Sequence, residues 1–268
     1  MIDRRHCFRP GIACTLYVSL KIKNMGRRYL LLCGVLASLL YIAMNIFIPI
    51  FYEGYNWKSQ VVSELSAIDA PTRFLWVIPG IIYTLLIAAF GWGVLTSAAQ
   101  KRPLRIAGIL LIVNGLLGLT WSPMHQREVL AAGGGTFTDT WHIVMSVITV
   151  LLMFLTIGFA SAALGRRFRV YSIATIVVFI VFGILTFIEG PNVGNNFTTP
   201  LIGLWERINI AAFMLWLLVF ALALLRKKKY LFSRPDLFSR PGVKVRIDQS
   251  PVQAAEKIET IHKPEWLL

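Results

Sequence analysis

Six long apolar stretches dominate this chain and restrict its possible folds. They run near Tyr29 to Tyr52, Phe74 to Ala99, Ile106 to Trp121, Trp141 to Leu164, Val170 to Ile188 and Ile208 to Leu225. About 20 apolar residues in a helix cross the hydrocarbon of a bilayer, and an open sheet edge has no hydrogen-bond partners there. Only 15% of the residues are charged, against about 25% in a soluble domain. The sequence therefore predicts an all-α membrane protein with six transmembrane helices.

The basic residues predict the orientation of these helices. Of the 27 Lys and Arg residues, 23 lie before the first stretch, after the last one, or in the short links at 100–105 and 165–169. The four others are Lys58, Arg73, Arg127 and Arg207. Because cytoplasmic loops are enriched in Lys and Arg, we expect three helical hairpins with both termini in the cytoplasm. The net charge of +14 is thus explained by topology, and we expect no nucleic-acid partner.

The chain divides into a core and two basic appendages. Residues 29–225 form the six-helix core, residues 1–28 a basic N-terminal arm, and residues 226–268 a basic, largely disordered cytoplasmic tail. We hypothesise that Met25 is the true start of the protein; the alternative is that the arm lies on the inner leaflet. The tail carries four consecutive bases from Arg226 and suits anionic lipids.

Polar residues gather at the predicted outer ends of the helices. In hairpins these ends reach one depth, which predicts an outward-facing polar pocket for a small ligand, a lipid headgroup or an ion. The candidate residues are Ser63, Glu64, His125, Asp139, His142, Glu189, Glu206 and Arg207. Four of them also have a simpler interpretation: Asp139 caps a helix, His142 lies at the membrane interface, and Glu206 and Arg207 are exposed to solvent.

A subset of these residues has the chemistry of a metal site. Asp139 and His142 are three residues apart on one helix face, His125 lies across the same hairpin, and Glu64 supplies a further carboxylate. Two His side chains with carboxylates suit zinc or another divalent metal, and a metal-bound water attacks esters or amides. No HExxH motif is present. The alternative function is therefore an interfacial metal-dependent hydrolase or transferase, with the catalytic residues unassigned.

Two further patterns concern packing. Val61, Val62, Leu65 and Ile68 recur at helical spacing and predict a short helix in the first external loop. Gly108, Gly115 and Gly118 permit close helix packing around the third stretch. The spans lack paired helix breaks in corresponding halves, which disfavours the second alternative, a small transporter. The sequence leaves the oligomeric state open, with a homo-oligomer as one option.

Four segments together resemble a known family. They are "SELSAIDAP" after the first stretch, the Pro and His segment after the third, "TDTWH" before the fourth, and "GLWERINI" at the sixth. The set resembles a prokaryotic family of six-helix membrane proteins catalogued only as a domain of unknown function, over roughly Tyr29 to Leu225. "SELSAIDAP" is also similar to the first external loop of DRAM/Frag1/Sfk1-like membrane proteins. Matching positions are Ser63, Glu64, Pro71, His142, Glu206 and Arg207.

That resemblance implies the six-span fold and the cluster of polar residues at the outer helix ends, but supplies no reaction. The sequence as a whole predicts a multi-pass protein of the bacterial inner membrane which binds a ligand at its outer face. The ligand and any cofactor stay unassigned.

Overall fold

The computed structural model describes residues 12–232, with side chains from 25 to 226, and every regular element in that part is a helix. The predictions for the arm before residue 12 and for the tail beyond 232 lie outside it. The chain divides into two compact units, Met1–Lys228 and Lys229–Leu268, and the first contains all of the described side chains.

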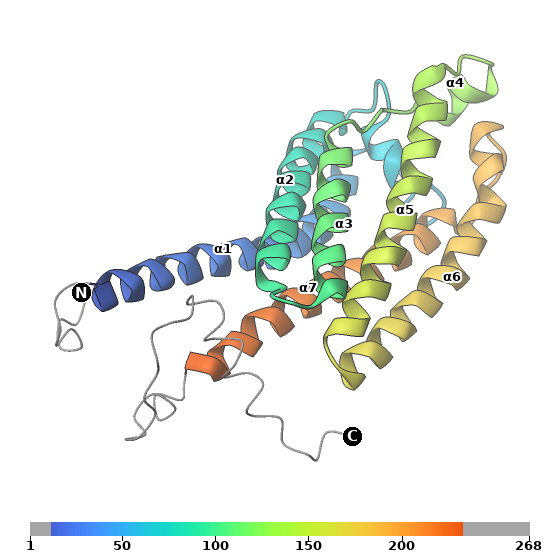
Figure 1. The fold of residues 1–268 in the computed structure, drawn as a ribbon. Coiled ribbons are helices and arrows are strands. Elements are labelled where there is room, and N and C mark those ends of the chain that lie inside the picture. Colours follow the sequence, from blue (N-terminus) through green and yellow to red (C-terminus); the bar gives the residue numbers. More distant parts are fainter. Residues whose placement is uncertain (1–11, 233–268) are drawn as a thin grey trace. The chain divides into compact units, whose positions relative to one another are not determined.

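Seven α-helices and two short 3₁₀ helices succeed one another along the described residues (Figure 1). The helices are α1 Ile12–Phe47, η2 Ile48–Phe51, η3 Val62–Ser66, α2 Arg73–Ser97, α3 Arg102–Gly118, α4 Arg127–Ala131, α5 Phe137–Ala163, α6 Arg166–Gly194 and α7 Ile202–Phe232. The predicted short helix of the first loop is confirmed as η3. The helical backbone of α1 begins at Ile12 and so extends into the predicted arm.

Within the described residues, five segments are long and apolar enough to cross a membrane, which makes this chain a membrane protein. They are Met25–Phe51, Arg73–Ser97, Phe137–Ala163, Arg166–Gly194 and Ile202–Arg226. They coincide with five of the six predicted spans. The third predicted span is occupied by α3, which has 17 residues and is not among the five. The chain leaves the helix after Gly118, four residues before the Ser122-Pro123 pair.

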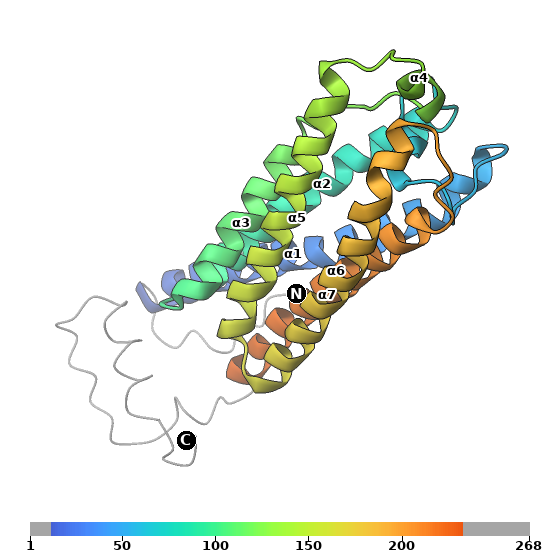
Figure 2. The ribbon, with the colours of Figure 1, turned by 90° about the vertical axis from the view of Figure 1, so that its right-hand side faces the viewer.

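Close backbone contact joins α2 and α3, which run antiparallel side by side (Figures 1 and 2). A Cβ built on Gly108 would lie 2.7 Å from the backbone nitrogen of Leu95, and one on Gly115 would lie 2.7 Å from the carbonyl oxygen of Thr84. Larger residues at these two positions would push the helices apart. The packing role predicted for the α3 glycines is thus confirmed.

An aromatic core fills the interior between the helices. Phe90 of α2 meets Phe220 of α7 edge to face at 5.6 Å, and Trp216 lies 5.1 Å from Phe220. The Trp216 indole N–H donates to Ser172 Oγ of α6 at 2.9 Å, and both residues are fully buried. Such a pair satisfies a polar group that would otherwise be stranded in an apolar environment. Many outward-facing Val, Ile, Leu and Phe side chains stay exposed, as expected of surfaces that face lipid.

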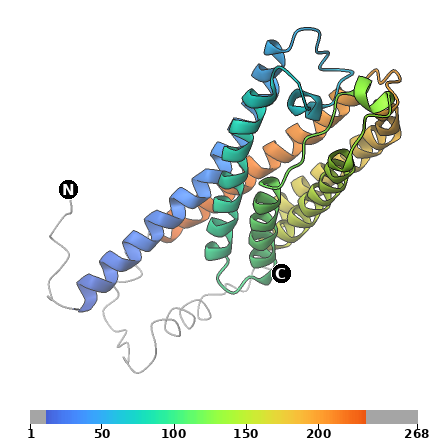
Figure 3. The same ribbon diagram turned by 90° about the horizontal axis from the view of Figure 1, so that it is seen from above.

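Three long connections meet at one end of the helices, which we call the long-loop end. Residues 48–72 link α1 to α2, residues 119–136 link α3 to α5, and residues 195–201 link α6 to α7. The first two of these connections lie at the same end of the helices in Figures 2 and 3. Backbone bonds fasten the first connection: Ile68 N donates to the Met124 carbonyl of the second connection, and Leu204 N of α7 donates to the Lys58 carbonyl. Within residues 12–232, the links at the opposite end are the short ones at 98–101 and 164–165.

Candidate functional site

A small apolar cluster lies at the long-loop end. We call it the loop cluster, and its buried members are Val61, Ala67, Ala70, Met124, Val193 and Ile202. They come from the first connection, the second connection, α6 and α7. The cluster therefore packs the first two connections against the ends of α6 and α7.

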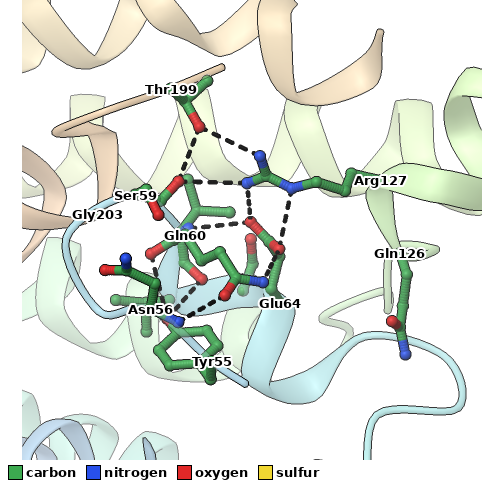
Figure 4. Close-up of polar contacts among 12 residues, drawn as sticks. Tyr55, Asn56, Ser59, Gln60, Glu64, Gln126, Arg127, Thr199 and Gly203 are labelled. Carbon is green, nitrogen blue, oxygen red and sulfur yellow. Dashed lines mark hydrogen bonds and ion pairs between the residues drawn. The ribbon is translucent and has the colours of Figure 1, made fainter. Parts of the chain in front are cut away.

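The strongest polar contact at this end is the ion pair of Glu64 with Arg127. Arg127 Nη2 donates to Glu64 Oε1 at 2.6 Å, and Arg127 Nε donates to Glu64 Oε2 at 3.2 Å (Figure 4). The Glu64 side chain is 4% exposed and the Arg127 side chain 11%. A two-bond guanidinium–carboxylate pair with so little water around it holds a fixed geometry. It ties η3 to α4.

Further hydrogen bonds engage both members of this ion pair. The Gln60 side-chain amide donates to Glu64 Oε2 at 2.8 Å, and the Val61 backbone N–H donates to Oε1 at 3.0 Å. Arg127 also donates to Thr199 Oγ1 at 3.2 Å, while the Thr199 hydroxyl donates to the Ser59 carbonyl at 2.7 Å (Figure 4). The pair is thus shared by all three connections.

The side chain of Arg207, on α7, binds backbone carbonyl groups of the first connection. Its Nη1 donates to the carbonyl oxygens of Trp57 at 2.9 Å, Gln60 at 3.3 Å and Gly203 at 3.1 Å, and its Nη2 donates to the Tyr55 hydroxyl at 2.7 Å. Gly203 makes this approach possible, because a Cβ there would collide with the Gln60 carbonyl and lie 2.6 Å from that of Trp57.

The Tyr55 hydroxyl links Arg207 to the backbone of the first connection. Burial raises the pKa of its phenol well above the usual range, although Arg207 opposes the shift. The phenol therefore keeps its proton and donates toward the Gln60 and Val61 carbonyls, at 3.2 and 2.9 Å. The guanidinium of Arg207 also lies 5.6 Å from the ring centroid, within cation–π range.

Glu206 and Glu189 lie one helical turn below the loop cluster. Ile202 and Val193 belong to that cluster, and the residues four positions deeper on the same faces of α7 and α6 are Glu206 and Glu189. The Val62 backbone N–H donates to Glu206 Oε2 at 2.6 Å. Glu189 Oε2 is buried without a hydrogen-bond partner among the described residues. Each carboxylate therefore lies one helical turn from a member of the loop cluster.

Asp139 and His125 form a second pair at the long-loop end. Asp139 accepts from the His125 backbone N–H at 2.6 Å, lies 2.9 Å from His125 Nδ1, and accepts from the Thr136 backbone N–H at 2.8 Å. The bond from Thr136 places the Asp139 carboxylate at the start of α5, so the capping role considered for Asp139 is confirmed.

His142 is directed away from that pair. Its Nδ1 lies 2.7 Å from the Ser122 carbonyl, and its ring meets Trp121 edge to face at 4.9 Å. Ser63 points elsewhere again: its hydroxyl donates to the Met124 sulfur at 3.0 Å. Of the candidate residues, the structure thus brings His125 to Asp139, and brings Glu206 to η3, the helix that contains Glu64.

The four residues suggested for a metal, His125, Asp139, His142 and Glu64, do not share one set of contacts. Glu64 is bound to Arg127, and His142 to Ser122. Across the described residues, no group of three or more His, Cys, Asp or Glu side chains is arranged to hold a metal ion. Metal analysis of the purified protein is the direct test of that prediction.

The sequence also matches a protein-family model. The family described as "Protein of unknown function (DUF998)" covers residues 35–223, most of the chain. This chain belongs to that family. The resemblance to a family of unknown function is thereby confirmed, and the matched segment contains every candidate residue. No curated protein and no solved structure matches the chain.

Within this DUF998 segment, the sequence analysis missed four residues that build the site. They are Tyr55, Gln60, Arg127 and Thr199. Arg127 carried a usable signal, because it is one of only four basic residues predicted on the outer side, where seven acids also lie. A cation so placed was the natural partner for a buried acid. Tyr55, Gln60 and Thr199 carried no comparable signal.

Unpartnered oxygen atoms lie just below the network. Asn45 Oδ1 of α1, Glu189 Oε2 of α6 and Asn209 Oδ1 of α7 are each buried without a hydrogen-bond partner in the described part of the chain. Asn45 uses its side-chain nitrogen to bond the Tyr41 carbonyl at 2.9 Å, which fixes its oxygen as the free atom. All three residues lie within about two turns of the long-loop ends of their helices. Arg207 Nε is also buried and unpartnered, on the side of α7 that binds the first loop.

Proposed function

We propose that this DUF998 protein is a multi-pass membrane protein that binds a small ligand in its outward-facing half. The ligand site is a polar layer formed by Asn45 of α1, Glu189 of α6, and Glu206 and Asn209 of α7. The observation that carries the proposal is the set of buried acceptor oxygens on Asn45, Glu189 and Asn209 that no described protein group satisfies. An unmade hydrogen bond of this kind costs about 1–3 kcal/mol, so three in one layer favour a bound partner.

The position of the layer supports the same proposal. Glu189 and Glu206 lie one helical turn from Val193 and Ile202 of the loop cluster, and the Glu64–Arg127 pair fastens the connections at the same end. Asn209 reaches toward α6, where its side-chain nitrogen lies 3.9 Å from a Cβ built on Gly183. Gly183 leaves open the space that a side chain would occupy between the two helices.

The pairing of the other candidates favours binding over catalysis. A hydrolase needs a free base or a metal-bound water. The Glu64 carboxylate, however, is ion-paired with Arg127, and the Asp139 carboxylate accepts hydrogen bonds from His125 and Thr136. Arg207 is engaged by backbone carbonyls. These side chains serve as the frame that positions the polar layer.

We further propose that α3 completes a sixth crossing. Its 17 residues measure about 25 Å at 1.5 Å per residue. It starts beside the end of α2, with Gly108 against Leu95, and ends near the middle of α2, with Gly118 against Thr84. The chain then continues to Met124, whose carbonyl accepts from Ile68 just before α2. A segment that returns along a spanning helix from one end to the other crosses the same membrane.

Six crossings put both termini on one side. The asymmetry of 23 basic residues against four supports a cytoplasmic location for the termini and an outward orientation for the long-loop end. Cysteine substitutions test this, in a chain whose Cys7, Cys14 and Cys33 are replaced by Ser. A membrane-impermeant maleimide on intact cells should label Gly133→Cys and leave Gln100→Cys unlabelled. Equal labelling of both would refute the crossing by α3.

Native mass spectrometry tests the ligand. Wild-type protein extracted in mild detergent should carry a discrete small-molecule adduct, and Asn209→Leu should carry none. Leu has the same number and branching of side-chain heavy atoms as Asn, and it removes the unsatisfied oxygen. If wild type carries no adduct and Asn209→Leu is simply more stable to unfolding, the layer is a buried mismatch filled by water and the proposal fails.

A further inference from the structure

Six basic side chains lie at the two short links, at the end of the helices opposite the long-loop end. We call them the basic end: Lys101, Arg102 and Arg105 at the start of α3, and Arg166, Arg167 and Arg169 at the start of α6, all of them exposed. The two links are neighbours, because Lys101 Nζ lies 3.5 Å from the carbonyl oxygen of Ala163, the last residue of α5. The six charges therefore gather over one part of the protein surface.

No acidic side chain of residues 25–226 lies at the basic end. The acids in that range belong to the long connections or to the helix turns near the long-loop end, and they are Glu53, Glu64, Asp69, Glu128, Asp139, Glu189 and Glu206. Within the part of the chain that the structure describes, the six bases therefore have no carboxylate partner. A surface of one sign raises the local concentration of ions of the other sign, so the basic end attracts anions.

Exposed apolar side chains continue the helix faces that carry four of these bases. Residues four positions apart lie on one face of a helix, one turn from each other. Each base and the exposed apolar residue one turn further into the helix form four pairs: Arg102 with Ile106, Arg105 with Ile109, Arg166 with Val170, and Arg169 with Ile173. We call the four apolar residues the apolar rows. A positive charge at the helix end with lipid-facing carbon below it matches a phospholipid, whose phosphate lies above its acyl chains.

Helix α5 lies between the two helices that carry the apolar rows. It contacts both α3 and α6, and it runs between them in Figures 1 and 2. Its exposed positions near the basic end include two small residues, Ala162 and Gly158, and a Cβ added to Gly158 would meet nothing within 4 Å. The surface of α5 at this end therefore leaves room for an acyl chain.

From this arrangement we infer that the basic end and the apolar rows bind an anionic phospholipid. The arginines bind its phosphate, because a guanidinium donates to two phosphate oxygens at once, and the apolar rows contact its acyl chains. A zwitterionic lipid fits less well, since the ammonium group that it carries is repelled by the six bases. A soluble phosphate compound gains nothing from the apolar rows. The site lies at the other end of α6 from Glu189, so it is separate from the polar layer proposed above.

Native mass spectrometry of the full-length protein in an uncharged detergent measures this preference. Phosphatidylglycerol and phosphatidylcholine with the same acyl chains are titrated separately, and wild type should bind phosphatidylglycerol more tightly. One basic residue near an anionic headgroup contributes roughly fivefold in affinity, so Arg105→Gln/Arg169→Gln should weaken phosphatidylglycerol binding by about 30-fold. Binding of phosphatidylcholine should change much less. Glycerophosphoglycerol, the same headgroup without acyl chains, should not displace phosphatidylglycerol at equal concentration.

Two further variants assign the effect to the basic end. Arg102→Gln/Arg166→Gln removes a different pair of its arginines and should weaken binding to a similar extent. Lys227→Gln/Lys228→Gln makes an equal change of charge beyond Arg226 and should keep the wild-type preference. Equal affinity of wild type for the two lipids would refute the site. Loss of the preference in the lysine variant but in neither arginine variant would overturn it, because the lipid would then bind the tail. Displacement by glycerophosphoglycerol would also overturn it, because the site would then bind a soluble anion.

Discussion

Removal of Arg127 should be among the most damaging single substitutions outside the helix core. In Arg127→Met the aliphatic volume is kept and the charge is lost, so Glu64 remains 4% exposed without its cation. Loss of one partner of a buried ion pair costs about 3–5 kcal/mol. Gln60 and Val61 still donate to Glu64, which places the expected loss near the lower bound, about 3 kcal/mol. The loss should appear as reduced free energy of unfolding.

Equilibrium unfolding in mixed detergent micelles, monitored by circular dichroism, measures this loss. Lys58→Met is the matched control, because Lys58 is an exposed base on the first connection; it should change stability by no more than about 0.5 kcal/mol. The double variant Glu64→Gln/Arg127→Met should be more stable than the sum of its single changes by about 2 kcal/mol. A loss below about 1 kcal/mol for Arg127→Met, or simple additivity, would show that the pair does not fasten the connections.

Three other substitutions probe individual contacts. Gly203→Ala should destabilise the protein by more than about 2 kcal/mol in the same unfolding assay, because the new Cβ would meet the backbone of residues 57 and 60. Gly158→Ala is the control: its Cβ would meet nothing, so the free energy of unfolding should stay the same or rise by up to about 1 kcal/mol. Equal effects of the two substitutions would contradict this reasoning. Ser172→Ala should lower the free energy of unfolding by about 1 kcal/mol and alter tryptophan fluorescence, because the Trp216 N–H loses its acceptor. An unchanged spectrum and an unchanged stability would count against that hydrogen bond. His142→Ala should leave metal content by plasma mass spectrometry at the wild-type background, since Nδ1 lies against Ser122; stoichiometric zinc in wild type that disappears in the variant would instead support the metal site.

The positions of the helices were predictable, because hydrophobic length and charge asymmetry are local properties of a sequence. Five spans, the short helix of the first loop and the close-packing glycines of α3 were all visible in such patterns. The length of α3 was not predictable to a turn, since the apolar pattern continues through Leu119 although the helix ends at Gly118.

Side-chain partners were much harder to predict than helices. Glu64 was grouped with His125, Asp139 and His142 as a metal ligand, but its partner is Arg127, 63 positions away. Thr199 joins the same network from 72 positions beyond Arg127. Which acid meets which base depends on how the three connections fold over one another, and no local pattern records that. The gathering of polar residues at one end was predictable; their pairing was not.

The dependence of the first connection on α7 has a consequence for biosynthesis. Arg207, Glu206 and Gly203 supply contacts to the backbone of residues 57–62, yet they belong to α7, the last of the described helices to leave the ribosome. During synthesis, α2 to α6 are therefore made before the loop after α1 meets these partners. A nascent or truncated chain that lacks α7 presents that loop without them, and a protease that recognises loose segments would distinguish it from a finished molecule.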